Sequence, residues 1–403
     1  MTMDTQHERK PRVLVIAGRA GKLKVAADAG YEVVYLQNPQ LFADTHRAHV
    51  SQALLMDYTR IDEVLPVVAG LHAADRLDLV VSFTDPGLEP AAVIGERLGL
   101  PGNPPAVSTV LRDKYALRRL LADAGIEEHP CARVRTAEEL KAFCTKHHYP
   151  VILKPQDGTG SQGIRRIDSP EDADRAFADR PDSDGALLAE TLLTGMEVSV
   201  ESITQHGHHR VIAITEKFID ENYVELGHVV PARIAPGQRD AIEKLVLSLL
   251  DAVGLAEGCA HTEVMLTADG PVIIESHNRM GGDRIYELVR LSHGTDLERL
   301  SFTLPLDADT LPPTPTPTRA AAVWFVRAEP GRVLSVDGES EAKAAEGVCE
   351  VVVTTGPGSE VNPVRSSADR IGYVIAVGAD ADEALDRARR AAQSVVVRTE
   401  EAA

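Results

Sequence analysis

Cysteine is scarce in this 403-residue chain, and long apolar runs and basic charge are lacking as well. The cysteines, Cys131, Cys144, Cys259 and Cys349, are scattered and form no C-x-x-C pair. This argues against a zinc site or a disulfide framework and fits a reducing cytoplasm. No apolar run is long enough to span a membrane, and the polar start MTMDTQHERKPR has no apolar signal core. We therefore expect a cytoplasmic protein with no membrane partner.

Basic residues are outnumbered, because 42 Lys and Arg stand against 61 Asp and Glu, for a formal net charge of -19. This balance argues against sequence-independent nucleic-acid binding, which needs a basic surface. With 44% hydrophobic and 26% charged residues, the composition is that of a globular protein of two to four domains. A small-molecule enzyme fits best. If such an enzyme used ATP, it would need a local site of positive charge and would need to recruit metal ions.

The N-terminal hundred residues alternate apolar runs with helical segments. Strands are predicted over RVLVIAG (12–18), YEVVYLQ (31–37) and LDLVVSF (77–83), and helices around 21–30, 60–73 and 87–98. This alternation indicates a parallel, doubly wound sheet. The first turn, Gly18-Arg19-Ala20-Gly21, matches neither a dinucleotide fingerprint nor a P-loop. Ligands of such sheets bind at the carboxyl ends of strands, and SFTDPGLEP (82–90) is one such end.

Composition shifts divide the rest of the chain. A proline-rich connector (100–107) precedes a predicted helix over 108–125, with Ser108 as its cap and Gly125 as its stop. LPPTPTPT (311–318) reads as a stiff linker. We predict α/β and α+β units in a multidomain chain, with an N-terminal Rossmann-like domain and a C-terminal α+β domain. The predicted boundaries are 1–106, 107–190, 191–310, the linker 311–318, and 319–403.

A glycine loop in YPVILKPQDGTGSQGIRRID matches the text G-x-G-x-x-G through Gly158, Gly160 and Gly163. A dinucleotide fingerprint needs a helix directly after the glycines, but a short β-compatible run, 164–167, follows them here. The loop therefore joins two strands and could fold over a ligand, with its backbone N–H groups and Lys154 directed at phosphates. A hairpin loop without a ligand is the alternative.

Two glutamates face each other in a predicted hairpin, HTEVMLTADGPVIIESHNR (261–279). Glu263 and Glu275 each lie six residues from Asp269 in the turn, so they should be opposite one another. Like charges across a sheet are unfavourable unless something positive lies between them. Mg²⁺ fits such a pair, with Asn278 as a further oxygen ligand, and Arg279 could hold a carboxylate or phosphoryl group. A general acid/base pair and a solvent-facing hairpin are the competing interpretations.

Together these segments resemble the ATP-grasp superfamily. The resemblance rests on Lys114 in RDKYALRRLLADAG, Lys154 with its glycine loop, the hinge-like strand LLAETLLTGMEVSVES (187–202), and the glutamate hairpin, in that order along the chain. Within the superfamily the chain is most similar to the L-amino acid ligases of the bacilysin synthetase type. ITEKFIDENYVELGHVVPA, ESHNRMGGD and the C-terminal domain carry that likeness.

The resemblance implies an ATP-dependent carboxylate–amine ligase that uses ATP and Mg²⁺, or Mn²⁺ in its place. A substrate carboxylate would become an acylphosphate, and an amine would capture it to give an amide or dipeptide, ADP and phosphate. In this scheme 107–190 carries the lid and 191–310 the metal and catalytic residues. The implied catalytic residues are Arg279 and Lys154. The implied metal ligands are Glu263, Glu275 and Asn278. The implied ATP-binding residues are Lys114, Lys154, Gly158, Thr159, Gly160, Ser161, Gly163, Glu190 and Leu192 with Leu193 at adenine, and Glu197 at ribose.

Substrate contacts are expected from His228, Arg233, Gly281, Gly282 and Asp283, with small-molecule carboxylates and amines as the partners. Related ligases are often dimers, so a homodimer is compatible with the resemblance. Two alternatives stay open. One is a biotin carboxylase-like or purine-biosynthesis ligase, and the other is a nucleotide-binding regulator that no longer catalyses.

Overall fold

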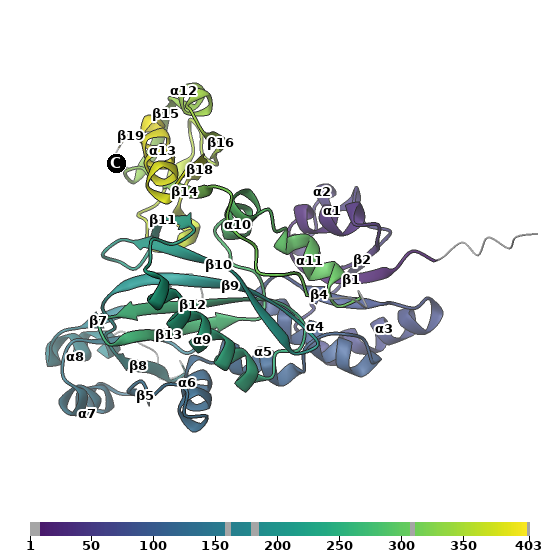
Figure 1. Cartoon of the computed structure of the whole chain (residues 1–403), viewed down its shortest axis with the longest axis horizontal. Helices are drawn as coiled ribbons and strands as arrows, with labels where there is room; N and C mark the ends of the chain where they lie inside the picture. The colour runs from purple at the N-terminus through teal and green to yellow at the C-terminus, as the bar shows by residue number, and fades with distance from the viewer. Residues whose placement is uncertain (1–8, 158–162, 179–184, 307–310, 401–403) are drawn as a thin grey trace, which may run out of the picture.

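The computed structural model describes residues 9–157, 163–178, 185–306 and 311–400. Figure 1 shows a large central sheet, with the N-terminal domain at one end, a small unit containing α7 and α8 at the other, and the C-terminal domain above. The predicted α/β and α+β architecture is confirmed.

The N-terminal domain is a parallel sheet in the order β3-β2-β1-β4. The strand β1 is buried along its whole length because helices cover both faces of the sheet, as is usual for parallel sheets. Leu14 and Ile16 pack towards α3 and α4, whereas Val13 and Val15 pack towards α1 and α11. The elements are β1 (Arg12–Ile16), α1 (Ala20–Asp28), β2 (Glu32–Gln37), η1 (Pro39–Leu41), α2 (Asp44–Arg47), β3 (Gln52–Leu55), α3 (Ile61–Ala74), β4 (Leu79–Ser82) and α4 (Asp85–Leu98).

The helix predicted over 108–125 is in fact two helices, α5 (Pro105–Arg112) and α6 (Lys114–Asp123). Asp113 interrupts the helical backbone with an extended conformation, and its carboxylate accepts hydrogen bonds from the N–H groups of Tyr115 and Ala116. Asp113 is therefore the N-cap of α6, and the predicted cap at Ser108 was wrong, because Ser108 lies inside α5. Lys114 is therefore the first residue of α6.

The small unit contains β5 (Cys131–Val134), α7 (Ala137–His147), β6 (Val151–Pro155), β7 (Arg165–Ile167), α8 (Pro170–Ala178) and β8 (Leu187–Thr191). Its sheet has the order β5-β8-β6-β7. The strands β6 and β7 are antiparallel, with Val151 opposite Ile167. The prediction that the glycine segment joins two strands, and not a strand to a helix, is confirmed.

The central sheet runs β13-β12-β9-β10-β11-β14-β18-β16. Its first half is built from β9 (Met196–Gln205), β10 (His208–Ile219), β11 (Glu225–Val230), β12 (Gly258–Thr267) and β13 (Gly270–His277). The long helix α9 (Pro236–Val253) packs on one face through Ile242, Val246 and Leu249. The helix α10 (Ile285–His293) covers the other face, and α11 (Leu297–Thr303) connects this core to the N-terminal sheet. Each face of the central sheet is therefore partly covered by a helix.

The C-terminal domain continues the central sheet across the 311–318 segment. Its strand β14 (Ala320–Val326) pairs with β11, and Ala322 lies opposite Val229. The other elements are β15 (Gly331–Asp337), α12 (Glu339–Ala344), β16 (Val348–Val353), β17 (Glu360–Val361), η2 (Ser367–Asp369), β18 (Gly372–Gly378), α13 (Ala381–Ser394) and β19 (Val396–Glu400). No helix in the described part of the chain is long and apolar enough to cross a membrane.

His293, at the end of α10, is buried in a way that gives a pH prediction. Burial, with a smaller effect of Arg239, lowers its pKa to about 4. Below about pH 6.5 the unfolded chain binds a proton at this histidine more readily than the folded protein does. The free energy of unfolding is therefore at its full value above about pH 6.5 and decreases as the pH falls towards 4. The loss amounts to about 3 kcal/mol at 1.4 kcal/mol per pKa unit. The thermal unfolding midpoint should therefore fall less steeply between pH 7 and pH 5 in His293→Gln than in the unmodified chain. Parallel pH profiles would contradict this.

Candidate active site

A cleft between the small sheet and the central sheet brings together most of the predicted nucleotide and metal residues. We call it the lysine cleft, because Lys114, Lys154 and Lys217 line it. Its walls also carry apolar side chains such as Ile152 and Met265. Eight residues predicted from the sequence line it: Lys114, Lys154, Glu190, Leu192, Leu193, Glu197, Glu263 and Glu275. They come from α6, β6, β8, the link after β8, β9, β12 and β13, so the fold converges them from distant segments.

The two hairpin glutamates lie opposite each other, as predicted, but the turn alone does not produce this pairing. The two-residue turn sets a register in which Val264 pairs with Ile273. Continued without interruption, this register would place Ile274 opposite Glu263. An irregularity directly after Glu263 shifts the pairing by one residue, and Glu263 then faces Glu275. The bulge therefore creates the carboxylate pair.

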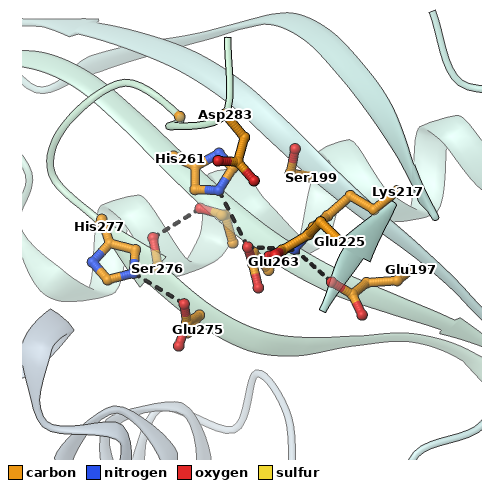
Figure 2. Close-up of polar contacts among 12 residues, drawn as sticks. Glu197, Ser199, Lys217, Glu225, His261, Glu263, Glu275, Ser276, His277 and Asp283 are labelled. Atoms are coloured by element: carbon orange, nitrogen blue, oxygen red, sulfur yellow. Dashed lines mark hydrogen bonds and ion pairs between the residues drawn. The ribbon is translucent and has the colours of Figure 1, made fainter. Parts of the chain in front are cut away.

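Lysines neutralise this pair. Lys217 Nζ lies 2.5 Å from Glu263 Oε1 and 2.5 Å from Glu197 Oε1, and Lys114 Nζ lies 2.8 Å from Glu275 Oε2. Figure 2 shows Lys217 between Glu263 and Glu197. His277 adds a contact of 3.1 Å from Nε2 to Glu275 Oε1. Each carboxylate of the facing pair, Glu263 and Glu275, is therefore already bound to a basic side chain, at a place where a metal cation could bind.

The ionisation of both hairpin glutamates follows from these neighbours. Burial alone would raise the pKa of Glu263, but Lys217 outweighs burial and lowers that pKa. In the same way burial would raise the pKa of Glu275, and Lys114 with His277 brings that pKa well below its ordinary value. Both groups are therefore carboxylates at neutral pH, which is the state needed for a metal ligand.

A buried ion network surrounds Glu190. Its two carboxylate oxygens contact Arg118 Nε and Lys154 Nζ, each at 2.5 Å. Burial opposes ionisation, but Lys154 and Arg118 lower the pKa of Glu190 to about 2. Arg118 also donates to Glu127, at 2.9 Å, and to the carbonyl of Ile273, at 2.5 Å. This network ties α6 to β8 of the small sheet and to β13 of the central sheet.

Removing Arg118 should weaken the whole chain. Arg118→Met leaves Glu127 and Glu190 buried with one cation fewer, and breaking a buried charge pair costs about 3–5 kcal/mol. The thermal unfolding midpoint should drop by several degrees. The matched control is Arg119→Met on the same helix, because its exposed pair with Asp123 contributes less than about 1 kcal/mol. Equal midpoints for the two variants would contradict the role given to Arg118.

The segment after β13 turns away from the lysine cleft and meets the N-terminal domain. Asn278 donates to Ser108 Oγ at 3.0 Å and lines a smaller pocket together with Lys114 and His277. Arg279 binds Asp85 through two contacts of 2.8 Å each. Burial would raise the pKa of Asp85, but hydrogen bonds from His277 and Arg279 lower it. Arg279 thus already holds one carboxylate, which is the kind of group predicted for it.

A second cleft lies between the N-terminal domain, the segment after β13 and the C-terminal domain. We call it the arginine cleft, because Arg19, Arg279, Arg284 and Arg370 line it. Among the residues predicted to contact substrate, Gly281, Gly282 and Asp283 line this cleft. His228 is buried behind it, with Nε2 3.5 Å from Asp283 Oδ2. Gly281 allows close approach, because a Cβ there would lie 2.8 Å from His261 Nδ1.

Arg233 is placed differently from the other predicted substrate residues. Its guanidinium binds Glu216, with Nη2 2.6 Å from Oε1, and it contacts Asp382 of α13 at 2.6 Å. It lines neither the lysine cleft nor the arginine cleft. In this structure the side chain therefore ties the central sheet to the C-terminal domain.

Much of the predicted glycine lid, Gly158, Thr159, Gly160 and Ser161, falls outside the described residues. Gly163 is described and has φ of +74°, a conformation that favours glycine. A Cβ at this position would lie 3.1 Å from Pro155 Cγ. Glycine is therefore required where the chain returns to β7.

Several site residues were not found by sequence reasoning. Lys217 sits in the strand IAITEKFI, and a lysine among buried apolar residues of a central strand was the available signal. Asp85 is the first residue of α4, three positions after the end of β4, in the segment that was singled out as a ligand position. Arg118 and Glu127 gave no local signal, because their partners are distant in the sequence.

Comparison with known proteins agrees with this geometry. Residues 147–287 match the model of the ATP-grasp domain, 23–102 match the ATP-grasp N-terminal domain, and 323–400 match the L-amino acid ligase C-terminal domain 2. The chain therefore contains an ATP-grasp domain, an ATP-grasp N-terminal domain and a C-terminal domain of the L-amino acid ligase type. The predicted class, an ATP-dependent ligase that joins a carboxylate to an amine, is confirmed.

The relatives make the likeness more specific. The L-amino acid ligase from Bacillus licheniformis superposes with a TM-score of 0.86 at 22% identity, covering 98% of this chain and 100% of that one. A Sinorhizobium fredii protein, y4rH, is 26% identical over 91% of this chain and 77% of its own length. A D-alanine--D-alanine ligase of Streptomyces griseus is 27% identical over 65% of this chain. The chain covers 66% of that ligase, slightly less than two thirds of its length.

Proposed function

We propose that this ligase activates the carboxylate of an amino acid as an acylphosphate and couples it to an amine, giving an amide or dipeptide. The observation that carries the proposal is the convergence of eight predicted residues in one cleft that contains a facing pair of carboxylates. The similarity to an L-amino acid ligase along nearly the whole chain supports the choice of amino acids as substrates.

ATP would bind in the lysine cleft. The apolar wall, including Ile152, Met265 and Ile274, suits the flat face of adenine. Both Glu190 oxygens already bind basic groups. We therefore propose that the backbone near Leu192 and Leu193 makes the adenine contact that was predicted for Glu190. Glu197 remains our proposal for ribose. Lys154 and Lys114 would contact the phosphates, and Gly163 begins the return from the lid.

The donor set of the hairpin fits Mg²⁺. Glu263 and Glu275 supply two ionised carboxylates, and Mg²⁺ typically takes one or two carboxylates plus substrate phosphates and water. Among the described residues no group of three or more His, Cys, Asp or Glu forms a closed metal cage, which is compatible with a site completed by phosphates. Asn278 is proposed as a further oxygen ligand. Mn²⁺ prefers similar ligands.

The chemistry follows from the positions of these groups. A carboxylate oxygen of the donor attacks the γ-phosphorus, the bond from that phosphorus to the β-bridging oxygen breaks, and ADP leaves. The deprotonated amine then attacks the acyl carbon, and phosphate leaves with the former carboxylate oxygen. Bound Mg²⁺ would neutralise charge on the phosphates. Lys154 would stabilise the transferred phosphoryl group, and Arg279 would hold the reacting carboxylate or the tetrahedral intermediate.

An ADP-release screen over pairs of amino acids, with mass spectrometry of the products, tests this function. We expect ADP only when a donor and an amine acceptor are both present, together with a product lighter than the pair by one water. ADP formation with bicarbonate plus biotin, or with phosphoribosylamine, would support the other ligase types instead. ATP binding without turnover across the panel would support a regulator. A cytoplasmic location and a homodimer remain predictions.

A further inference from the structure

The two clefts differ in their charge. The lysine cleft is balanced, because Lys114, Arg118, Lys154 and Lys217 face Glu190, Glu197, Glu263 and Glu275. The arginine cleft has five basic residues, Arg19, Lys22, Arg279, Arg284 and Arg370, against three acids, Asp85, Asp283 and Glu298. A cleft with excess positive charge in a chain of net charge -19 concentrates anions.

Each acid of the arginine cleft is already paired. Asp85 binds Arg279, as described above. Asp283 accepts from both terminal nitrogens of Arg370, at 2.8 and 2.5 Å. Glu298 Oε1 lies 2.5 Å from Lys22 Nζ. A substrate ammonium therefore finds no acid in this lining that lacks a basic partner.

Two arginines of the lining are left over from these pairs, Arg19 and Arg284, and of the two only Arg284 has an acidic partner among the described residues. Arg284 pairs at 2.7 Å with Glu350, a residue outside the lining. The buried Nε of Arg284 has no hydrogen-bond partner among the described residues. Arg19 forms no ion pair with any described residue, and its side chain does not cap the helix that it precedes. Arg284 has φ of +67°, and Asp283 before it has φ of +49°. Such backbone strain in residues other than glycine is typical of functional sites.

From this imbalance we propose that the arginine cleft selects a substrate with a second carboxylate, and that Arg19 binds that group. The inference rests on the proposed function and adds the substrate class: an acidic amino acid or another dicarboxylate. A guanidinium binds a carboxylate through two parallel hydrogen bonds, which gives both charge and geometric selectivity. Tyr286 and Tyr373 also line the cleft, and Arg284 lies over both rings.

Binding of matched probes tests the proposal. We would measure calorimetrically the binding of L-aspartate against L-asparagine and of L-glutamate against L-glutamine, with Mg²⁺ and a non-hydrolysable ATP analogue present. Each pair has nearly the same size but differs in charge. At least one acid should bind roughly tenfold or more tightly than its amide, as expected for a charged hydrogen bond. No preference for the acids, or no binding of either acid, would overturn the proposal.

The variant Arg19→Gln should abolish most of this preference while leaving amide binding unchanged. The matched control is Arg47→Gln, an exposed arginine of the same domain that pairs only with nearby Asp44 among the ion pairs of the described chain. A preference that survives in Arg19→Gln overturns the assignment. In the ADP-release assay the same variant should raise KM for the acidic substrate by about tenfold with kcat nearly constant, since Arg19 would bind the carboxylate that does not react.

These measurements separate the two levels of the argument. If neutral pairs release ADP as well as acidic ones, the ligase function stands and the acidic selectivity is wrong. If no amino-acid pair releases ADP, the proposed function fails, and the calorimetric comparison still decides whether the cleft prefers a second carboxylate.

Discussion

Glu275→Gln is expected to abolish ATP turnover while the protein remains folded. The change removes one of the two facing carboxylates and its charge, but keeps the shape of the side chain. Loss of the metal's charge stabilisation, worth several kcal/mol, corresponds to a fall in kcat of about a thousandfold or more. The measurement is the rate of ADP formation at saturating ATP and Mg²⁺ with a productive substrate pair. Circular dichroism and thermal unfolding verify the fold.

The interpretation of that variant needs a control of the same chemistry. Glu243→Gln replaces a partly exposed glutamate on α9 that pairs with Arg239 one turn away, and it should leave ADP formation unchanged. Because Glu275 also holds Lys114, a lowered stability alone is not informative. Near-normal ADP formation by Glu275→Gln would remove the hairpin from the metal site.

The second large effect is expected for ATP binding by Lys154→Ala. Lys154 is buried at the edge of the lysine cleft and is the predicted phosphate contact next to the glycine loop. A hydrogen bond to a charged group contributes about 1.5–3 kcal/mol, so the Kd for ATP should rise by roughly ten- to a hundredfold. Equilibrium binding of a fluorescent ATP analogue would measure this change.

Lys154→Ala should also lower the stability, because it leaves buried Glu190 with Arg118 as its one remaining cation, so circular dichroism must first show that the variant is folded at the assay temperature. Lys146→Ala, an exposed lysine of α7 in the same small unit, is the matched control and should bind ATP normally. An unchanged ATP affinity for Lys154→Ala would show that this lysine does not contact the nucleotide.

Local patterns predicted much of the fold because the elements concerned are determined by neighbouring residues. The apolar runs of β1 and β2 indicated a parallel sheet buried on both faces. The break between α5 and α6 was missed, although Asp113 is a favourable N-cap, because the apolar pattern continues across it. The pairing of β14 with β11 could not be predicted, since no local pattern encodes which strands meet across a linker.

The site was predictable where its residues are close in the sequence. Counting from the hairpin turn placed Glu263 opposite Glu275, although the count succeeded only because a bulge shifts the register. The cations that hold these carboxylates were harder to identify. Lys217 reaches Glu263 across the sheet, and Asp85 reaches Arg279 over 194 positions of chain. Such contacts depend on the order of strands and on domain packing, which one sequence does not reveal.

Transfer of oxygen from substrate to phosphate tests the acylphosphate chemistry most directly. The donor identified in the ADP-release screen would be labelled with ¹⁸O in both carboxylate oxygens, and the phosphate and nucleotide products would be analysed by mass spectrometry. Attack of the carboxylate on the γ-phosphorus predicts one ¹⁸O in each phosphate released, one retained in the amide, and none in ADP. Labelled AMP, or phosphate without label, would contradict it.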